Sequence, residues 1–74
     1  MNQSDLQELF IQIGARIKHL RKEHHISQLE LGNIVGLSAN QIGRIERAEG
    51  NPTIKTLYLI ADYYNVEIGY FIDK

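Results

Sequence analysis

Two helix-capping signals lie close together in this 74-residue chain, and they constrain its fold more than any other feature. Ser27 precedes Glu30 by three positions, and Ser38 precedes Gln41 by the same spacing. In such a capping box, each of the two side chains accepts a hydrogen bond from the backbone N–H of the other residue. Gly36 lies between the boxes, and glycine tolerates the left-handed backbone of a tight turn between helices. We expect the two short helices to span residues 28–35 and 39–47.

The side chains of this pair of helices separate into an apolar inner face and a polar outer face. The inner face is expected to hold Leu31, Ile34, Val35, Leu37, Ile42 and Ile45. The outer face is expected to hold Gln28, Ala39, Asn40, Gly43 and Arg44. Small and hydrogen-bonding residues near the start of an exposed helix suit the edges of base pairs in a major groove. The pattern as a whole is typical of a helix-turn-helix that binds DNA.

A long helix is expected before the capped pair. Apolar residues at steps of three and four predict that it begins at Ser4 or Asp5 and ends at Glu23. His25 follows this helix, and histidine is one of the better non-glycine residues for a positive φ angle. The apolar stripe of the helix consists of Leu6, Leu9, Phe10, Ile13, Ile17 and Leu20.

Two more helices are expected after the pair. Pro52 and a capping Thr53 predict a fourth helix that ends near Asn65, and a short fifth helix is expected at residues 67–72. The stripe of the fourth helix that is expected in the core consists of Ile54, Leu57, Ile60, Ala61 and Tyr64. The chain is therefore predicted to be all-α, with five helices around one core in a single domain, residues 1–74.

Several motifs stand at spacings that resemble one family of regulators. They are Ile17-x-x-Leu20-Arg21, Ser27-Gln28-x-Glu30-Leu31, Gly36-Leu37-Ser38, Ile42-x-Arg44-Ile45-Glu46, Asn51-Pro52-Thr53 and Leu57-x-x-Ile60-Ala61. With these motifs, residues 13–72 resemble the helix-turn-helix family of phage repressors, Cro proteins and xenobiotic-response-element-like bacterial transcriptional regulators. The resemblance implies a compact lambda-repressor-like fold and a dimeric repressor or autoregulator that reads a short pseudo-palindromic operator. A restriction-modification controller protein is one subtype that fits.

The resemblance also implies, by position, which residues contact double-stranded DNA. Base reading is expected of Ala39, Asn40, Gln41, Gly43 and Arg44 in the third helix. Asparagine can pair with adenine, arginine with guanine, and alanine can touch a thymine methyl group. Contact with the DNA backbone is expected of Ser27, Gln28, Ser38, Arg47, Lys18, Lys22 and Asn51. Relatives often carry glycine where Ala48 stands here, so the sequence leaves open how the chain leaves the third helix.

Two structural contacts follow from the same resemblance. Arg21 and Glu46 are expected to form a partly buried ion pair between the first and third helices. A two-fold contact between copies of the chain is expected in residues 57–74. The large apolar side chains assigned to it lie off the predicted core stripes, and they are Leu59, Tyr63, Tyr70 and Ile72. The alternative is that these side chains cover the long first helix.

The net charge of −1 is unusual for a nucleic-acid-binding domain, but the charges are unevenly distributed. Residues 16–47, which include the capped pair, carry an excess of three positive charges. Residues 1–15 and residues 48–74 each carry an excess of two negative charges. Such a polarity would orient the molecule on a phosphate backbone.

Other classes of protein find little support in the composition. The chain has no cysteine, which excludes disulfides and suits the cytoplasm, and no apolar run is long enough to span a membrane. The acidic N-terminus, with Asp5 and Glu8, is unlike a secretion signal. A cytoplasmic protein is therefore expected.

An enzyme is the least favoured class. His19, His24 and His25 lie near the end of the first helix, where a cationic side chain is favoured by the helix dipole, and no cluster completes a metal site. No nucleophile stands at a spacing that would pair it with a base, so no cofactor or small-molecule ligand is expected. The main rival is an antitoxin-like module that binds another protein, with DNA binding as a secondary activity.

Overall fold

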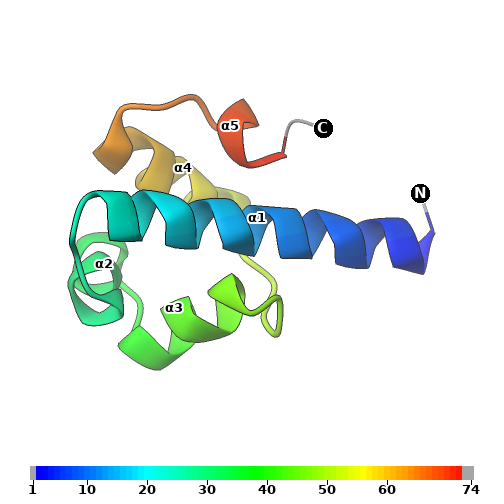
Figure 1. Cartoon of the computed structure of the whole chain (residues 1–74), viewed down its shortest axis with the longest axis horizontal. Helices are drawn as coiled ribbons and strands as arrows, with labels where there is room; N and C mark the ends of the chain where they lie inside the picture. Colours follow the sequence, from blue (N-terminus) through cyan, green and yellow to red (C-terminus); the bar gives the residue numbers. More distant parts are fainter. Residues whose placement is uncertain (1, 73–74) are drawn as a thin grey trace.

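The computed structural model describes residues 2–72, and this part of the chain contains helices but no strands. The helices are α1 (Gln3–Glu23), α2 (Gln28–Val35), α3 (Ala39–Glu46), α4 (Ile54–Tyr64) and α5 (Gly69–Ile72). The long α1 crosses the molecule, with α2 and α3 on one side and α4 and α5 on the other (Figure 1). The prediction of a compact five-helix fold is confirmed.

The two capping boxes form as predicted. Ser27 Oγ accepts from the N–H of Glu30 at 3.0 Å, while Glu30 Oε1 accepts from the N–H of Ser27 at 2.9 Å. Ser38 and Gln41 make the equivalent bonds, at 3.0 and 2.8 Å. Gly36 has a φ angle of 79°, which is the left-handed conformation that the turn requires. Local sequence alone therefore fixes the start of α2 and of α3.

Three predicted helix boundaries need correction. α1 begins at Gln3, because Asn2 caps it in a box with Asp5 that the analysis of the sequence missed. α3 ends at Glu46, and Arg47 is its C-cap. Helix α5 is shorter than predicted and begins at Gly69. Before it, carbonyl oxygens of residues 67 and 68 accept from N–H groups three residues ahead, which is the bonding of a tight turn.

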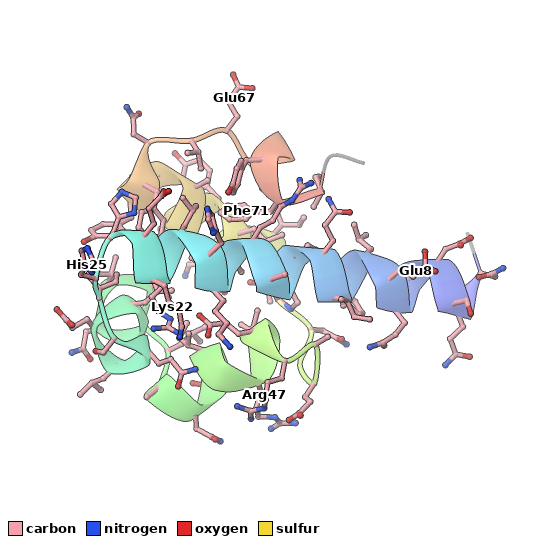
Figure 2. The ribbon with its side chains drawn as sticks, viewed as in Figure 1. Glu8, Lys22, His25, Arg47, Glu67 and Phe71 are labelled. Carbon is pink, nitrogen blue, oxygen red and sulfur yellow. The ribbon has the colours of Figure 1, made fainter. Side chains whose placement is uncertain are left out.

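One apolar core joins the helices, and Phe71 from α5 is fully buried against it beside α1 (Figure 2). The other buried apolar residues are Ile13, Ile17, Leu20, Leu31, Val35, Ile42, Ile45, Leu57, Ile60, Ala61 and Tyr64. Two core assignments were wrong. Ile54 is 72% exposed because it occupies the first position of α4, at the edge of the bundle, and Ile34 is 40% exposed because Leu31 and Val35 take the core positions of α2.

The chain leaves α3 through Ala48 in a left-handed conformation, with a φ angle of 60°. The N–H of Ala48 donates to the carbonyl of Ile45 at 3.1 Å, and the N–H of Glu49 donates to the carbonyl of Arg44 at 2.8 Å. Alanine thus adopts the backbone conformation that glycine adopts more easily. The turn stays at residue 48, which answers the question that the sequence left open.

Close packing between helices depends on two glycines. A Cβ atom on Gly14 of α1 would lie 2.5 Å from the carbonyl oxygen of Ile45 and 2.7 Å from that of Glu46. A Cβ atom on Gly32 of α2 would overlap the carbonyl oxygen of Leu37. These approaches press α1 against the end of α3 and α2 against the turn that leads into α3. The orientation of α3 is therefore set by backbone contacts as well as by side chains.

Tyr64 is the polar exception within this core. Among residues 2–72, its hydroxyl is buried without a hydrogen-bond partner, and its ring lies 4.7 Å from that of His24 between centroids. Burial raises the pKa of Tyr64 to about 12. A tyrosine in an unfolded chain has a pKa of about 10. The native state therefore favours the neutral hydroxyl, so this group contributes stability below pH ~10 that is lost as the pH rises to ~12.

We expect Tyr64→Phe to be at least as stable as the unchanged protein at pH 7, with a gain of up to about 1 kcal/mol. The variant should also lose less stability between pH 10 and 12, because it has no buried hydroxyl to ionise. Urea melts at a series of pH values measure both effects. Tyr58→Phe, at an exposed position of α4, is the control and should change neither. A clear loss of stability at pH 7 would mean that the hydroxyl has a partner.

Candidate nucleic-acid interface

The exposed face of α3 carries most of the residues that were predicted to read bases. Asn40, Gln41 and Arg44 are exposed, and Ala39 is half-buried. The capping box directs the first turn of α3 outward. Within it, Gln41 Oε1 accepts from the N–H of Ser38, so the carbonyl of this side chain is already engaged in capping. Asn40 and Arg44 are thus exposed polar side chains of α3 that take no part in its capping box.

Gly43 does not lie on this open surface, which corrects the prediction made for it. It is buried, and a Cβ atom on it would lie 3.0 Å from Arg47 Nη1 and 3.3 Å from both polar atoms of the Gln28 amide. Two predicted backbone-binding side chains therefore cover the glycine. Gly43 can meet a base only if Gln28 and Arg47 move aside.

Behind this face lies the ion pair that the sequence led us to expect. Arg21 Nε donates to Glu46 Oε2 at 2.7 Å, and Arg21 Nη2 donates to Glu46 Oε1 at 2.9 Å. Both side chains are buried, and the hydrogen bond to Glu46 raises the pKa of Arg21 above its ordinary value. Arg21 Nη1 also donates to the carbonyl of Ile26 at 3.1 Å. The bidentate pair joins α1 to α3 and to the connection before α2.

Gln28 extends this network to the surface. Its Nε2 donates to Glu46 Oε1 at 3.2 Å, and the side chain is half-buried over Gly43. The carboxylate of Glu46 therefore receives hydrogen bonds from α1 and from the first residue of α2. The buried pair fixes the direction of a side chain that was assigned to the DNA backbone. The role of Glu46 in orienting Gln28 was not predicted, because the sequence does not reveal distances between side chains of neighbouring helices.

The remaining predicted backbone contacts come from α1, from the N-caps of α2 and α3, and from the C-cap of α3. Lys22 and Arg47 point toward the side of α1 on which α3 lies, whereas Glu67 points from the opposite side (Figure 2). Lys18 is also exposed on α1. Arg47 Nε donates to Glu49 Oε2 at 3.2 Å in an exposed ion pair, which a phosphate would have to replace. The hydroxyls of Ser27 and Ser38 accept capping bonds, but each still has a proton to donate.

A shallow pocket connects α3 with the start of α4. Arg44 and Asn51, assigned respectively to bases and to the backbone, line it together with Gln41, Thr53 and Thr56. Sequence reasoning missed the two threonines as lining residues, since Thr53 carried only a capping signal. Asn51 and Arg44 thus line the same shallow pocket, to which Leu37, Ile45 and Pro52 add apolar surface.

The four residues assigned to the dimer contact do not form one patch. Ile72 lies near Pro52, Ile54 and Leu57, beside the start of α4. Tyr63 is at the other end of α4 and packs edge-on against Tyr64, whose ring contacts His24.

Leu59 and Tyr70 are half-buried and pack against the core. Tyr70 also lies under the guanidinium of Arg16, which donates to its carbonyl. Leu59, Tyr63, Tyr70 and Ile72 are therefore not all brought together, and the two-fold contact that was assigned to them stays a prediction.

No group of three or more histidine, cysteine, aspartate or glutamate residues within residues 2–72 could hold a metal ion. No helix among the described residues is long and apolar enough to cross a membrane.

The chain resembles proteins of known kind along most of its length. Residues 17–71 match the family model for helix-turn-helix proteins. Antitoxin PezA of Streptococcus pneumoniae is 39% identical over 54 residues, which cover 73% of this chain and 34% of PezA. Control protein C.SmaI of Serratia marcescens is 31% identical over 64 residues, which cover 86% of this chain and 73% of that protein. The chain spans between 34% and 63% of the length of four of its curated relatives.

A solved structure shows the same fold. The P22 c2 repressor protein, in complex with a synthetic operator, matches with a TM-score of 0.77 and 31% sequence identity. The match covers 82% of this chain and 92% of the repressor chain. Family model, relatives and structure agree with the resemblance drawn from the motifs, which is thereby confirmed. The chain belongs to the helix-turn-helix family that includes phage repressors and restriction-modification control proteins.

Proposed function

We propose that this chain is a sequence-specific DNA-binding transcriptional regulator that works in the cytoplasm as a homodimer. The observation that carries the proposal is the capped α3, whose exposed first turns present Asn40 and Arg44, with Arg44 lining one pocket together with Asn51. A helix presented in this way fits the major groove, and its N-terminal residues meet the base edges. The likeness to a repressor solved with its operator supports the same reading of the surface.

Different side chains would supply the affinity for DNA and the specificity for its sequence. Lys18 and Lys22 of α1 and Arg47 at the end of α3 are exposed cations, and they would contact phosphates. Asn40 would pair with adenine and Arg44 with guanine, which the major groove distinguishes by their donor and acceptor atoms. Ala39 would touch a thymine methyl group. In the proposed function the protein catalyses no covalent reaction and uses no cofactor.

The proposed homodimer implies a binding site with two-fold symmetry. Two copies related by a two-fold axis would place their α3 helices in successive major grooves, roughly 34 Å apart. The proposed operator is therefore a short pseudo-palindrome, and the regulator represses or autoregulates by occupying it. The identity to control protein C.SmaI favours the restriction-modification controller as a subtype.

Selection of bound sites from a random DNA pool at about 150 mM salt tests this function. Salt at that level suppresses binding that depends on charge alone. A two-fold consensus is expected, and it would give the half-site spacing directly. Recovery of sequences without any consensus would contradict sequence-specific binding.

We expect Arg44→Ala to lose roughly 1–3 kcal/mol of specific binding and to relax preference at one base pair of each half-site. Arg47→Ala is the matched control, since it removes a guanidinium from the rim and should weaken all sequences about equally. Titrations of the selected operator and of random DNA measure both. An equal loss on both DNAs for Arg44→Ala would limit Arg44 to phosphate contact.

A second candidate function is that of an antitoxin, in which a partner protein is the main target. The observation that favours it is the 39% identity to antitoxin PezA. The matching residues make up 34% of PezA, so this identity extends to about a third of that protein. Co-purification of a stoichiometric small protein, together with weak operator binding, would favour this second function.

A further inference from the structure

We infer that a groove at the end of α4 binds a basic segment of a partner protein that also presents a large apolar side chain. The groove lies between the last two turns of α4 and residues 65–68, which lead toward α5. We call it the acidic groove. The inference goes beyond the proposed function, and its test needs no DNA.

The less exposed lining of the acidic groove is apolar. Ala61 of α4 is buried, and Val66 and Ile68 of the following segment are half-buried against the core. Tyr58 also lines the groove and is 60% exposed, although its ring is large and apolar. An exposed aromatic side chain beside a hollow of aliphatic ones is a surface on which an apolar side chain of a partner can be buried.

Two carboxylates border this apolar lining. Asp62 and Glu67 are both exposed, and both line the groove. Within residues 2–72, neither of them forms an ion pair with a cation of the chain itself. Lys55 lies about two turns before Asp62 on α4 and does not line the groove. The groove therefore carries two carboxylates that a lysine or an arginine of a partner would complement.

The end of α4 adds to this preference for a cation. The C-terminus of a helix carries partial negative charge, which basic residues in the last turn commonly offset. The last turn of α4 contains no basic residue, and it contains Asp62 instead. A carboxylate that disfavours its own helix is explained by binding rather than by stability.

Position and charge select a protein as the partner. Both α4 and α5 lie on the opposite side of α1 from α3, and Glu67 points away from the side of Lys22 and Arg47 (Figure 1 and Figure 2). The acidic groove would therefore stay open while α3 contacts DNA. Its carboxylates would repel the phosphates of another nucleic acid. A second copy of the chain would have to turn its positive part, residues 16–47, away from DNA in order to bind there.

A nuclear magnetic resonance titration of the isotope-labelled full chain tests the acidic groove. The probe is a synthetic helical peptide of leucine and lysine, with the leucines along one face, and the control peptide has glutamate in place of lysine. The lysine peptide should shift the amide signals of Tyr58, Asp62, Val66 and Ile68 more than those of α1, α2 and α3. The glutamate peptide should not shift them. The affinity for the lysine peptide should fall as salt is added.

Asp62→Lys should weaken binding of the lysine peptide at least about tenfold, because it turns an attractive contact into a repulsive one. It should not lower the melting temperature, because a cation at the end of α4 suits the helix dipole. Glu8→Lys is the matched control, since it makes the same change of charge at an exposed position of α1 that lies well away from Glu67 (Figure 2). At about 150 mM salt it should alter the affinity less than about twofold, because charges that far apart are screened.

The opposite results would overturn the inference. Shifts centred on another part of the chain, equal shifts with the glutamate peptide, or equal losses for Asp62→Lys and Glu8→Lys would each show that the groove does not select a basic segment. An unfolded Asp62→Lys would contradict the argument from the helix dipole, and Glu67→Lys would then test the charge of the groove. Sedimentation of the unchanged chain and of Asp62→Lys separates the other occupant. If the substitution abolishes self-association, the groove takes a second copy and the inferred partner is wrong.

Discussion

Glu46→Ala is expected to lower the free energy of unfolding by about 3–5 kcal/mol. The substitution leaves the guanidinium of Arg21 buried without the carboxylate that it meets at 2.7 and 2.9 Å. It also removes the acceptor for Gln28. A domain of this size has a total stability of about 4–11 kcal/mol, so the variant could be largely unfolded. Guanidinium chloride melts followed by circular dichroism measure the loss.

An exposed ion pair of the same chain provides the control. Arg47 and Glu49 lie 3.2 Å apart with both side chains more than half exposed, and Glu49→Ala should cost under about 1 kcal/mol. Glu46→Gln keeps the shape and two hydrogen-bonding atoms, so it should fall between the two and remain measurable if Glu46→Ala does not fold. Equal small losses for Glu46→Ala and Glu49→Ala would show that the buried pair is not structural.

Gly14→Ala is expected to destabilise the protein by about 1–3 kcal/mol, even though alanine is the better helix former. Its methyl group would lie 2.5 Å from the carbonyl oxygen of Ile45, so α1 and the end of α3 must move apart. A backbone carbonyl cannot turn aside as a flexible side chain can. The same melts report the stability, and operator binding should fall as well because α3 is displaced.

Gly69→Ala is the matched control for this glycine. No heavy atom lies within 4 Å of a Cβ built on Gly69, and its φ angle is not positive. The control should therefore be neutral or slightly stabilising, as the helix propensity of alanine predicts. If Gly14→Ala behaved in the same way, the contact between α1 and α3 would be looser than the structure has it.

The helices that could be predicted from the sequence are those whose ends are encoded locally. Ser27, Ser38 and Thr53 cap helices through bonds to residues three positions ahead, and Asn65 ends α4 with a φ angle of 56°. Such signals need no knowledge of the tertiary structure. The length of α5 was wrong because the turn before it depends on how Phe71 reaches the core beside α1.

Assignments that depend on neighbouring elements were harder to make. Ile54 fits the apolar stripe of α4 by spacing, but the bundle does not extend far enough to cover it. Leu59 and Tyr63 were grouped with Ile72 because all three lie off a predicted stripe, yet the fold places Ile72 beside the opposite end of α4 from Tyr63. Periodicity gives the face of a helix, and it does not give the extent of what packs against that face.

Within the candidate site, the exposure of side chains could be predicted better than the contacts between them. Asn40 and Arg44 are exposed as the outer-face pattern suggested. The cover over Gly43 could not be foreseen, because it depends on the distance between α2 and α3 at the position of Gln28.

The hydrogen bond from Gln28 to Glu46 ties one residue of the proposed DNA interface to the buried ion pair, so that residue is less free to be substituted than the others. Asn40 and Arg44 are exposed outside the buried network, so under the proposed function new side chains there would change operator preference while the fold stays intact. Gln28 shares its carboxylate partner with the ion pair that holds α1 to α3. Under the proposed function, regulators derived from this chain would therefore diverge in the bases they read while keeping the register of their contacts with the DNA backbone.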